Sequence, residues 1–107
     1  MEIINQHISA LKKLCSKFYV SELYIFGSIA TGNYDENSDI DLLIRFSGVP
    51  PMDYLENYLN FKKEIENLFS RNVDLLEIQS LKNPVLKRSV NRDKIQLYGR
   101  EDRKIAV

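Results

Sequence analysis

The chain has 107 residues, 44% of them hydrophobic, and its fifteen basic and fifteen acidic residues leave a formal net charge of zero. A chain of this length suits one domain, and a zero net charge excludes a global field that would attract nucleic acid or an anionic membrane. The sequence has no long apolar run and no signal-like start, so we expect a cytoplasmic protein that does not bind membranes.

The spacing of apolar residues predicts a chain in which helices and strands alternate. Apolar positions from Ile4 to Phe18 recur at helical spacing, whereas the stretches ELYIF and IDLLIRF are typical of strands. The predicted elements, in chain order, are a helix over 2–19, a strand over 22–26, a strand over 40–46, a helix over 53–70, a strand over 73–78, a helix over 84–92 and a strand over 94–99. This order predicts an α/β (α+β) fold, in which a small mixed sheet has helices covering one face.

The domain is expected to span residues 1–107, with a flexible tail from about residue 100. The single Cys15 lies in the first predicted helix, where we expect a small buried apolar side chain, and one cysteine excludes a disulfide framework. The single His7 lies in the same helix and is expected to be half-buried. Mechanisms that depend on histidine or cysteine are therefore poor candidates.

Two aspartates, Asp39 and Asp41, stand at the start of the predicted strand over 40–46. Because side chains alternate across a strand, both point to the side without helices, while Ile40 and Leu42 point to the core. Two negative charges about 5 Å apart repel by roughly 3 kcal/mol at an effective dielectric of about 20. Mg²⁺ would offset this repulsion, since it binds one or two carboxylates together with waters and phosphate oxygens. Taken alone, the pair is a weak motif, because exposed aspartates at the start of a strand are often only solvated.

A second feature precedes the aspartates. Gly27 and Ser28 end one predicted strand and open a short turn of helix, where glycine lets a phosphate approach the backbone and the serine hydroxyl can bind its oxygens. A plain turn with Ser28 as the helix cap is the alternative. Asp74 opens the predicted strand over 73–78 and could join the other aspartates from a neighbouring strand, unless it is a surface residue after a turn.

These residues carry a family resemblance. Gly27 and Ser28, ten further residues and then Asp39 and Asp41, with Asp74 on a later strand, resemble the polymerase-beta-like nucleotidyltransferase superfamily. The chain is most similar to its minimal nucleotidyltransferase (MNT) members, which are encoded beside HEPN-domain proteins in toxin and antitoxin pairs. The resemblance implies that Asp39 and Asp41 bind two Mg²⁺ ions, that Asp74 holds the metal at the acceptor hydroxyl, and that Gly27 and Ser28 hold the triphosphate of ATP.

The chain departs from the family pattern at one position. Many relatives carry an arginine in the turn, where this chain has Thr31 within GSIATG. Arg45 could supply the missing cation, or it could pair with Asp41, whose side of the strand it shares. Tyr54 and Tyr58 stand near lysines, as in a surface that stacks RNA bases, but their helical spacing assigns them to a core or an interface.

Two functions remain open at this point. The first is an Mg²⁺-dependent enzyme that transfers AMP from ATP to a hydroxyl, by resemblance a tyrosine, of a HEPN-type toxin encoded by the neighbouring gene. The second is a non-catalytic antitoxin that neutralises its partner by contact alone. All three acidic positions are filled, which favours the enzyme. The segment 50–58 and the C-terminal tail are the expected partner contacts, and we expect no direct binding of nucleic acid.

Overall fold

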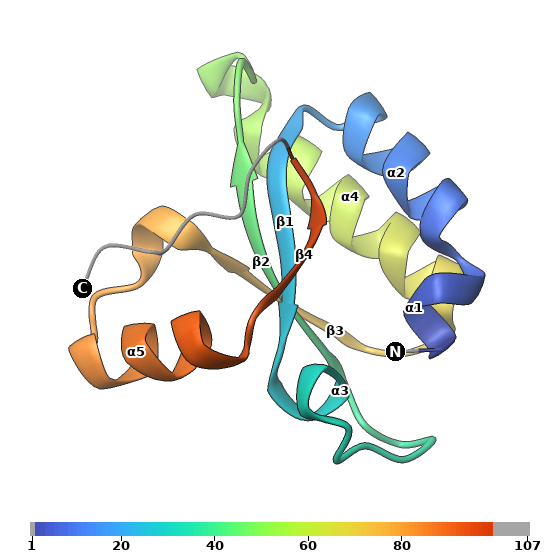
Figure 1. Ribbon diagram of the computed structural model, residues 1–107. Helices are drawn as coiled ribbons and strands as arrows, with labels where there is room; N and C mark the ends of the chain where they lie inside the picture. The colour runs from blue at the N-terminus through green and yellow to red at the C-terminus, as the bar shows by residue number, and fades with distance from the viewer. Residues whose placement is uncertain (1, 100–107) are drawn as a thin grey trace.

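The structure, a computed structural model, describes residues 2–99 (Figure 1). Its elements are α1 (Glu2–Gln6), α2 (Ile8–Lys17), β1 (Val20–Phe26), α3 (Gly27–Thr31), β2 (Ile40–Phe46), the 3-10 turn η1 (Pro51–Asp53), α4 (Tyr54–Phe69), β3 (Val73–Glu77), the 3-10 turn η2 (Ile78–Ser80), α5 (Pro84–Asp93) and β4 (Ile95–Tyr98). The tail that is expected to be flexible from about residue 100 lies outside the described residues. None of these helices is both long enough and apolar enough to cross a membrane.

The four strands form one mixed sheet in the order β3-β2-β1-β4. Strand β1 pairs antiparallel with β2 and β4, whereas β2 and β3 run parallel. A parallel pair needs a crossover connection, and α4 supplies it between the end of β2 and the start of β3 (Figure 1). The parallel pairing therefore brings the starts of β2 and β3 side by side.

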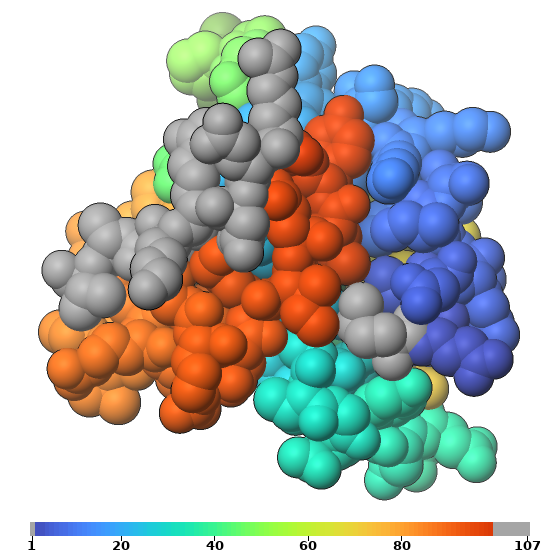
Figure 2. All heavy atoms as spheres, viewed as in Figure 1, coloured from blue at the N-terminus to red at the C-terminus, as the bar shows by residue number. Residues whose placement is uncertain are grey.

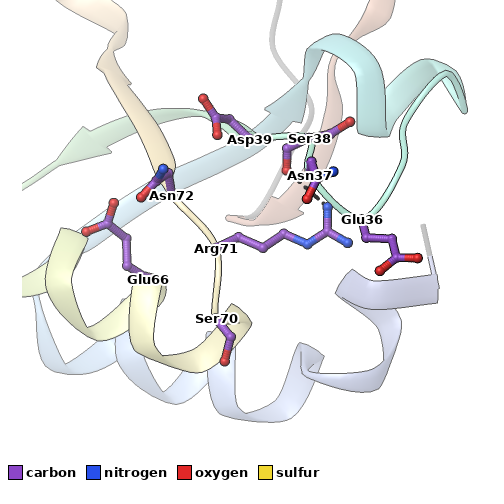
Figure 3. A pocket seen from close by; sticks show the side chains of 8 residues that line it. All are labelled: Glu36, Asn37, Ser38, Asp39, Glu66, Ser70, Arg71 and Asn72. Carbon is purple, nitrogen blue, oxygen red and sulfur yellow. Dashed lines mark hydrogen bonds between the residues drawn. The ribbon is translucent and has the colours of Figure 1, made fainter.

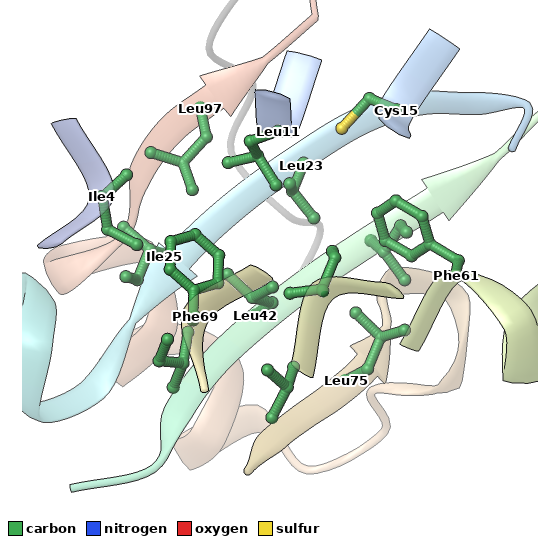
Figure 4. Packing of buried hydrophobic residues seen from close by; sticks show 14 of the residues in the cluster. Ile4, Leu11, Cys15, Leu23, Ile25, Leu42, Phe61, Phe69, Leu75 and Leu97 are labelled. Carbon is green, nitrogen blue, oxygen red and sulfur yellow. The ribbon is translucent and has the colours of Figure 1, made fainter. Parts of the chain in front are cut away.

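Helices α2 and α4 cover one face of this sheet, as predicted, and enclose the main hydrophobic core (Figure 4). The strands contribute alternate residues to it, and Leu42 and Ile44 of β2 are fully buried. Helix α4 contributes Phe61 and Ile65, which are four residues apart and so lie on one side of the helix. Cys15 belongs to this core, and its burial raises the pKa of the thiol to about 12, so it acts as an apolar side chain.

Helix α5 packs against the opposite face, which the sequence predicts to be free of helices. Its Val90 joins Tyr24 and Leu43 in a second, smaller buried cluster to which Ile78 and Leu81 also belong. Helix α5 also contacts α3, and in the space-filling view its orange atoms lie beside the turquoise atoms of α3 (Figure 2). The fold class is confirmed, but the face that carries Asp41 has a helical wall on one side.

The first predicted helix is interrupted. Helix α1 ends at Gln6 and α2 begins at Ile8, with His7 between them. The His7 ring is half-buried, as predicted, and packs edge-to-face on Phe69 with ring centroids 5.4 Å apart. The break thus places the imidazole against the end of α4.

Candidate active site

Helix α3 follows β1 directly and places the Gly-Ser dipeptide at the end of a central strand. Gly27 has a φ of +73°, in the left-handed region that glycine adopts at little cost. A Cβ at this position would overlap Oδ2 of Asp41, whose residue pairs across the sheet with Phe26. Gly27 therefore allows the Asp41 carboxylate to approach the chain, a role that sequence reasoning missed.

Ser28 and Thr31 lie in the same short helix. The Thr31 hydroxyl is 3.2 Å from the carbonyl oxygen of Gly27 and 3.3 Å from that of Ser28, so it caps the helix it belongs to. Gly32, at a φ of +85°, ends the helix. The Ser28 hydroxyl is half-buried and makes no hydrogen bond within residues 2–99. It remains able to bind an anion.

The three aspartates come from the starts of two neighbouring strands. Asp41 on β2 is the register partner of Asp74 on parallel β3. Because Ile40 and Leu42 are buried in the main core, the Asp41 side chain projects from the other face, and its partner Asp74 projects with it. Asp39 precedes β2 by one residue and, like Asp74, is exposed. The structure therefore brings together residues that the sequence places far apart.

The negative charges of Asp39 and Asp74 act on the Asp41 carboxyl. Partial burial of Asp41 raises its pKa above the usual aspartate range, and the negative charges of Asp74 and then Asp39 raise the pKa further. Within residues 2–99, no three acidic, histidine or cysteine side chains already converge in metal-binding geometry. The carboxylates thus form an open acidic surface.

This donor set fits a hard divalent cation. It consists only of carboxylate oxygens, and it leaves positions for water and phosphate oxygens. Gly27 keeps the space beside Asp41 free of a side chain. The residue types present therefore fit Mg²⁺.

Arg45 takes neither of the roles considered for it. Its Nε donates to Oε2 of Glu22 over 2.8 Å, and the Tyr24 hydroxyl donates to the other carboxylate oxygen over 2.9 Å. Glu22 is only 6% exposed, and the two charged residues are register partners on β1 and β2. The pairing with Asp41 is thus wrong, because the cross-strand neighbour is closer; this register was the signal that could have identified it.

Tyr54 and Tyr58 do not form a base-stacking surface. Their rings pack edge-to-face on Phe46, with centroids 5.6 and 6.4 Å apart. The Tyr54 hydroxyl donates to Glu77 over 2.7 Å, and the Tyr58 hydroxyl donates to the carbonyl oxygen of Leu75. Both residues hold α4 against β3, as the core assignment predicts.

A shallow pocket of about 400 Å³ lies next to Asp39, on the side of the α4–β3 turn (Figure 3). Its lining residues come from the loop before β2 and from the end of α4: Glu36, Asn37, Ser38, Asp39, Glu66, Ser70, Arg71 and Asn72. Sequence reasoning did not single out this loop or Arg71, because only the tertiary fold brings them together.

Comparison with known families assigns this arrangement. The model of the nucleotidyltransferase domain family matches residues 8–97, and the chain belongs to that family. The relative named "Putative protein adenylyltransferase MJ1379" from Methanocaldococcus jannaschii is 34% identical over 88% of this chain and 90% of its own length. Protein adenylyltransferase MntA from Thermococcus cleftensis is 34% identical over 81% of this chain and 86% of its own length.

Solved structures share the fold. A toxin-antitoxin crystallised with AMP-PNP aligns with a TM-score of 0.68 at 23% identity, over 88% of this chain and 74% of the other. A complex of tri-AMPylated Shewanella oneidensis HEPN toxin with MNT antitoxin aligns with a TM-score of 0.61 at 19% identity, over 90% of this chain and 72% of the other. Together with the family match and the 34% identity to MntA, the shared fold confirms the resemblance to the minimal nucleotidyltransferases.

Proposed function

We propose that this protein transfers AMP from ATP to a hydroxyl, by family resemblance a tyrosine hydroxyl, of a HEPN-type toxin and thereby acts as its antitoxin. The observation that carries the proposal is the register pairing of Asp41 with Asp74 beside the Gly27 turn. The AMP-PNP complex and the AMPylated toxin among the solved relatives support the substrate and the acceptor class.

Each part of the site has a distinct task in this proposal. The Ser28 hydroxyl and the backbone at Gly27 bind the triphosphate, because the hydroxyl has no other partner in the described chain and no side chain blocks the glycine. By the family resemblance, Asp39 and Asp41 would hold two Mg²⁺ ions, and Asp74 would hold the metal that activates the acceptor hydroxyl. When bound, the metal lowers the pKa of the acceptor hydroxyl and neutralises the departing pyrophosphate.

The proposed reaction needs no nucleophile or general base from this protein. The acceptor oxygen attacks the α-phosphorus, the bond between that phosphorus and the bridging oxygen of the pyrophosphate breaks, and the hydroxyl proton passes to solvent. AMP is then joined to the toxin through a phosphodiester. The aspartates bind and orient, and neither His7 nor Cys15 is needed.

A transfer assay tests the proposal. Purified partner from the neighbouring gene, Mg²⁺ and α-labelled ATP are incubated with the wild type, with Asp41→Asn, and with Glu64→Gln as a control on the exposed side of α4. We expect label on the partner with the wild type and the control, none with Asp41→Asn, and an AMP-tyrosine by mass spectrometry. If wild type and Asp41→Asn neutralise the toxin equally and neither transfers label, the contact-only antitoxin is the correct function.

A further inference from the structure

Asp39 lies outside the sheet. It is the last residue of the loop that joins α3 to β2, and it is exposed, whereas Asp41 and Asp74 are anchored by strand pairing. The three negative charges repel one another. Strand pairing resists this repulsion for Asp41 and Asp74, but a loop residue can move away. A contact on the loop side of Asp39 would oppose this movement.

The loop next to Asp39 is folded into a compact turn. The backbone N–H of Ser38 donates to the carbonyl oxygen of Asp35 over 3.2 Å, and the backbone N–H of Asp35 donates to Oγ of Ser38 over 3.0 Å. The Asp35 carboxylate accepts a hydrogen bond from the backbone N–H of Asn37 over 2.8 Å. Residues 35–38, named here the Asp35 turn, thus form one rigid unit directly before Asp39.

Arg71 attaches this turn to the neighbouring strand. Its Nη1 donates to the carbonyl oxygen of Asp35 over 2.9 Å and to that of Ser38 over 3.0 Å. The Ser38 carbonyl belongs to the peptide that joins Ser38 to Asp39. Figure 3 shows the guanidinium extending from the α4–β3 turn toward Ser38, while the Asp39 carboxylate points away from it.

Arg71 also stands in the segment that delivers Asp74. The next residue, Asn72, accepts a hydrogen bond at its carbonyl from the backbone N–H of Ile40 over 3.0 Å, and β3 begins immediately afterwards at Val73. One guanidinium therefore connects the two chain segments that bring Asp39 and Asp74 to the same end of the sheet. Within residues 2–99 Arg71 forms no ion pair with Asp39, so it does not neutralise the metal-binding charge.

We propose that Arg71 is a positioning residue that fixes the Asp35 turn and thereby holds Asp39 in reach of the metal site. This inference rests on the proposed function for the metal itself. An arginine suits the task, because its charged planar group makes strong, directed hydrogen bonds to carbonyl oxygens without occupying the carboxylate. The same contact supplied by lysine lacks this fixed geometry.

The first experiment needs no metal and no activity. Amide hydrogen exchange is measured on metal-free wild type and on Arg71→Met, which keeps the aliphatic part of the side chain but removes its donors. We expect faster exchange at the Ser38 and Ile40 amides in the variant, with core amides such as that of Leu42 unchanged. Equal exchange at Ser38 and Ile40 in both proteins would overturn the proposal.

The second experiment measures binding of Mn²⁺ alone, by calorimetry, well below the melting temperature. We expect Arg71→Met to raise the dissociation constant for Mn²⁺ by about tenfold or more, because loss of a contact that orients a metal ligand weakens metal binding. Arg88→Met, the same change at an exposed position on α5, is expected to bind like the wild type. A residue that served only general stability would lower the melting temperature and leave the affinity unchanged.

The outcomes separate the two proposals. Wild-type affinity in Arg71→Met would overturn the positioning role and leave the metal site intact. Absence of Mn²⁺ binding in the wild type would count against the proposed function, and the exchange experiment would still decide the role of Arg71. If Arg71→Met does not fold, Arg71→Lys takes its place: weaker Mn²⁺ binding than in the wild type supports the proposal, and equal binding contradicts it.

Discussion

Gly27 and Asp41 are in contact across the first two strands: the Asp41 carboxylate occupies the space that a Cβ on Gly27 would need. The glycine is the residue after Phe26, and Phe26 is the register partner of Asp41. The Gly-Ser turn and the acidic strand are therefore fitted to each other, independently of any ligand.

The first prediction is that Gly27→Ala abolishes transfer. Alanine at a positive φ costs about 1–3 kcal/mol, and its Cβ would in addition push the Asp41 carboxylate out of place. Gly32→Ala is the matched control, because Gly32 has a φ of +85° but no atom near its missing Cβ. Because both glycines have a positive φ, the melting temperature should fall in both variants. Only Gly27→Ala should lose AMP transfer. Equal activity in the two variants would show that the contact with Asp41 is unimportant.

The second prediction concerns the charge on Asp41. Because its pKa is raised in the folded state, the folded protein loses stability as pH rises from the ordinary aspartate range through that raised value. Asp41→Asn removes this cost, so at neutral pH its melting temperature should exceed that of the wild type by a few degrees. The difference should vanish at a pH below both pKa values. A variant that melts lower than the wild type at neutral pH would contradict this reasoning.

The third prediction separates Asp74 from the pair before it. If Asp74 acts at the acceptor side, Asp74→Asn should keep most binding of Mg²⁺-ATP but lower the transfer rate by orders of magnitude. Binding is measured by calorimetry and transfer with labelled ATP, and the melting temperature verifies folding. Loss of ATP binding and transfer together would assign Asp74 to the nucleotide; full activity would make it a surface aspartate.

The fourth prediction concerns a substitution that adds a positive charge to the turn over 27–32, which has none. Thr31 carries no charge, and the Arg45 guanidinium is paired with Glu22, so neither residue provides a positive charge to the phosphates. Thr31→Arg should add a charged hydrogen bond worth about 1.5 kcal/mol, which lowers the KM for ATP about tenfold. Thr31→Gln, which lacks the charge but also removes the hydroxyl cap, is the control. An unchanged KM in Thr31→Arg would place the triphosphate away from α3.

The fifth prediction concerns the partner surface. Met52 and Leu55, in the segment expected to contact the partner, are 98% and 68% exposed. They follow the end of β2, whereas Asp41 lies near its start, so the segment and the aspartates lie toward opposite ends of that strand. The double variant Met52→Asp with Leu55→Asp should weaken the toxin complex by about tenfold or more without changing ATP binding. Asn67→Asp, near the other end of α4, is the control; complex formation unchanged by the double variant would exclude this surface.

Local patterns were sufficient for most of the fold. The alternation in IDLLIRF and the prolines after it predict β2 with its observed limits, Ile40 and Phe46. The break at His7 was not predicted, because the apolar spacing continues through it and the Phe69 ring that it packs on is distant in sequence. The cover provided by α5 was missed because Val90 is its only buried residue, too weak a pattern to identify a packed face.

For the candidate site, the sequence predicts which residues stand at strand starts but not which contacts they make. The sequence predicts that Asp74 lies near Asp41, because each stands directly before an apolar run. The observed register pairs the two residues on β2 and β3. The partner of Arg45 depends on the strand register, and the partners of Arg71 depend on the tertiary structure. The spacing of apolar residues predicts neither.

The parallel pairing of β2 with β3 has a consequence for how the site forms as the chain folds. Asp41 and the Gly27 turn belong to one local antiparallel unit, whereas Asp74, and Arg71 with its contacts to the loop before Asp39, arrive only after α4 has crossed back over the sheet. Contacts of high sequence separation form late and cooperatively. A nascent chain, or one cut within α4, would contain Asp39 and Asp41 but lack the acceptor-side carboxylate of Asp74. In the proposed reaction, only fully folded molecules would therefore have antitoxin activity.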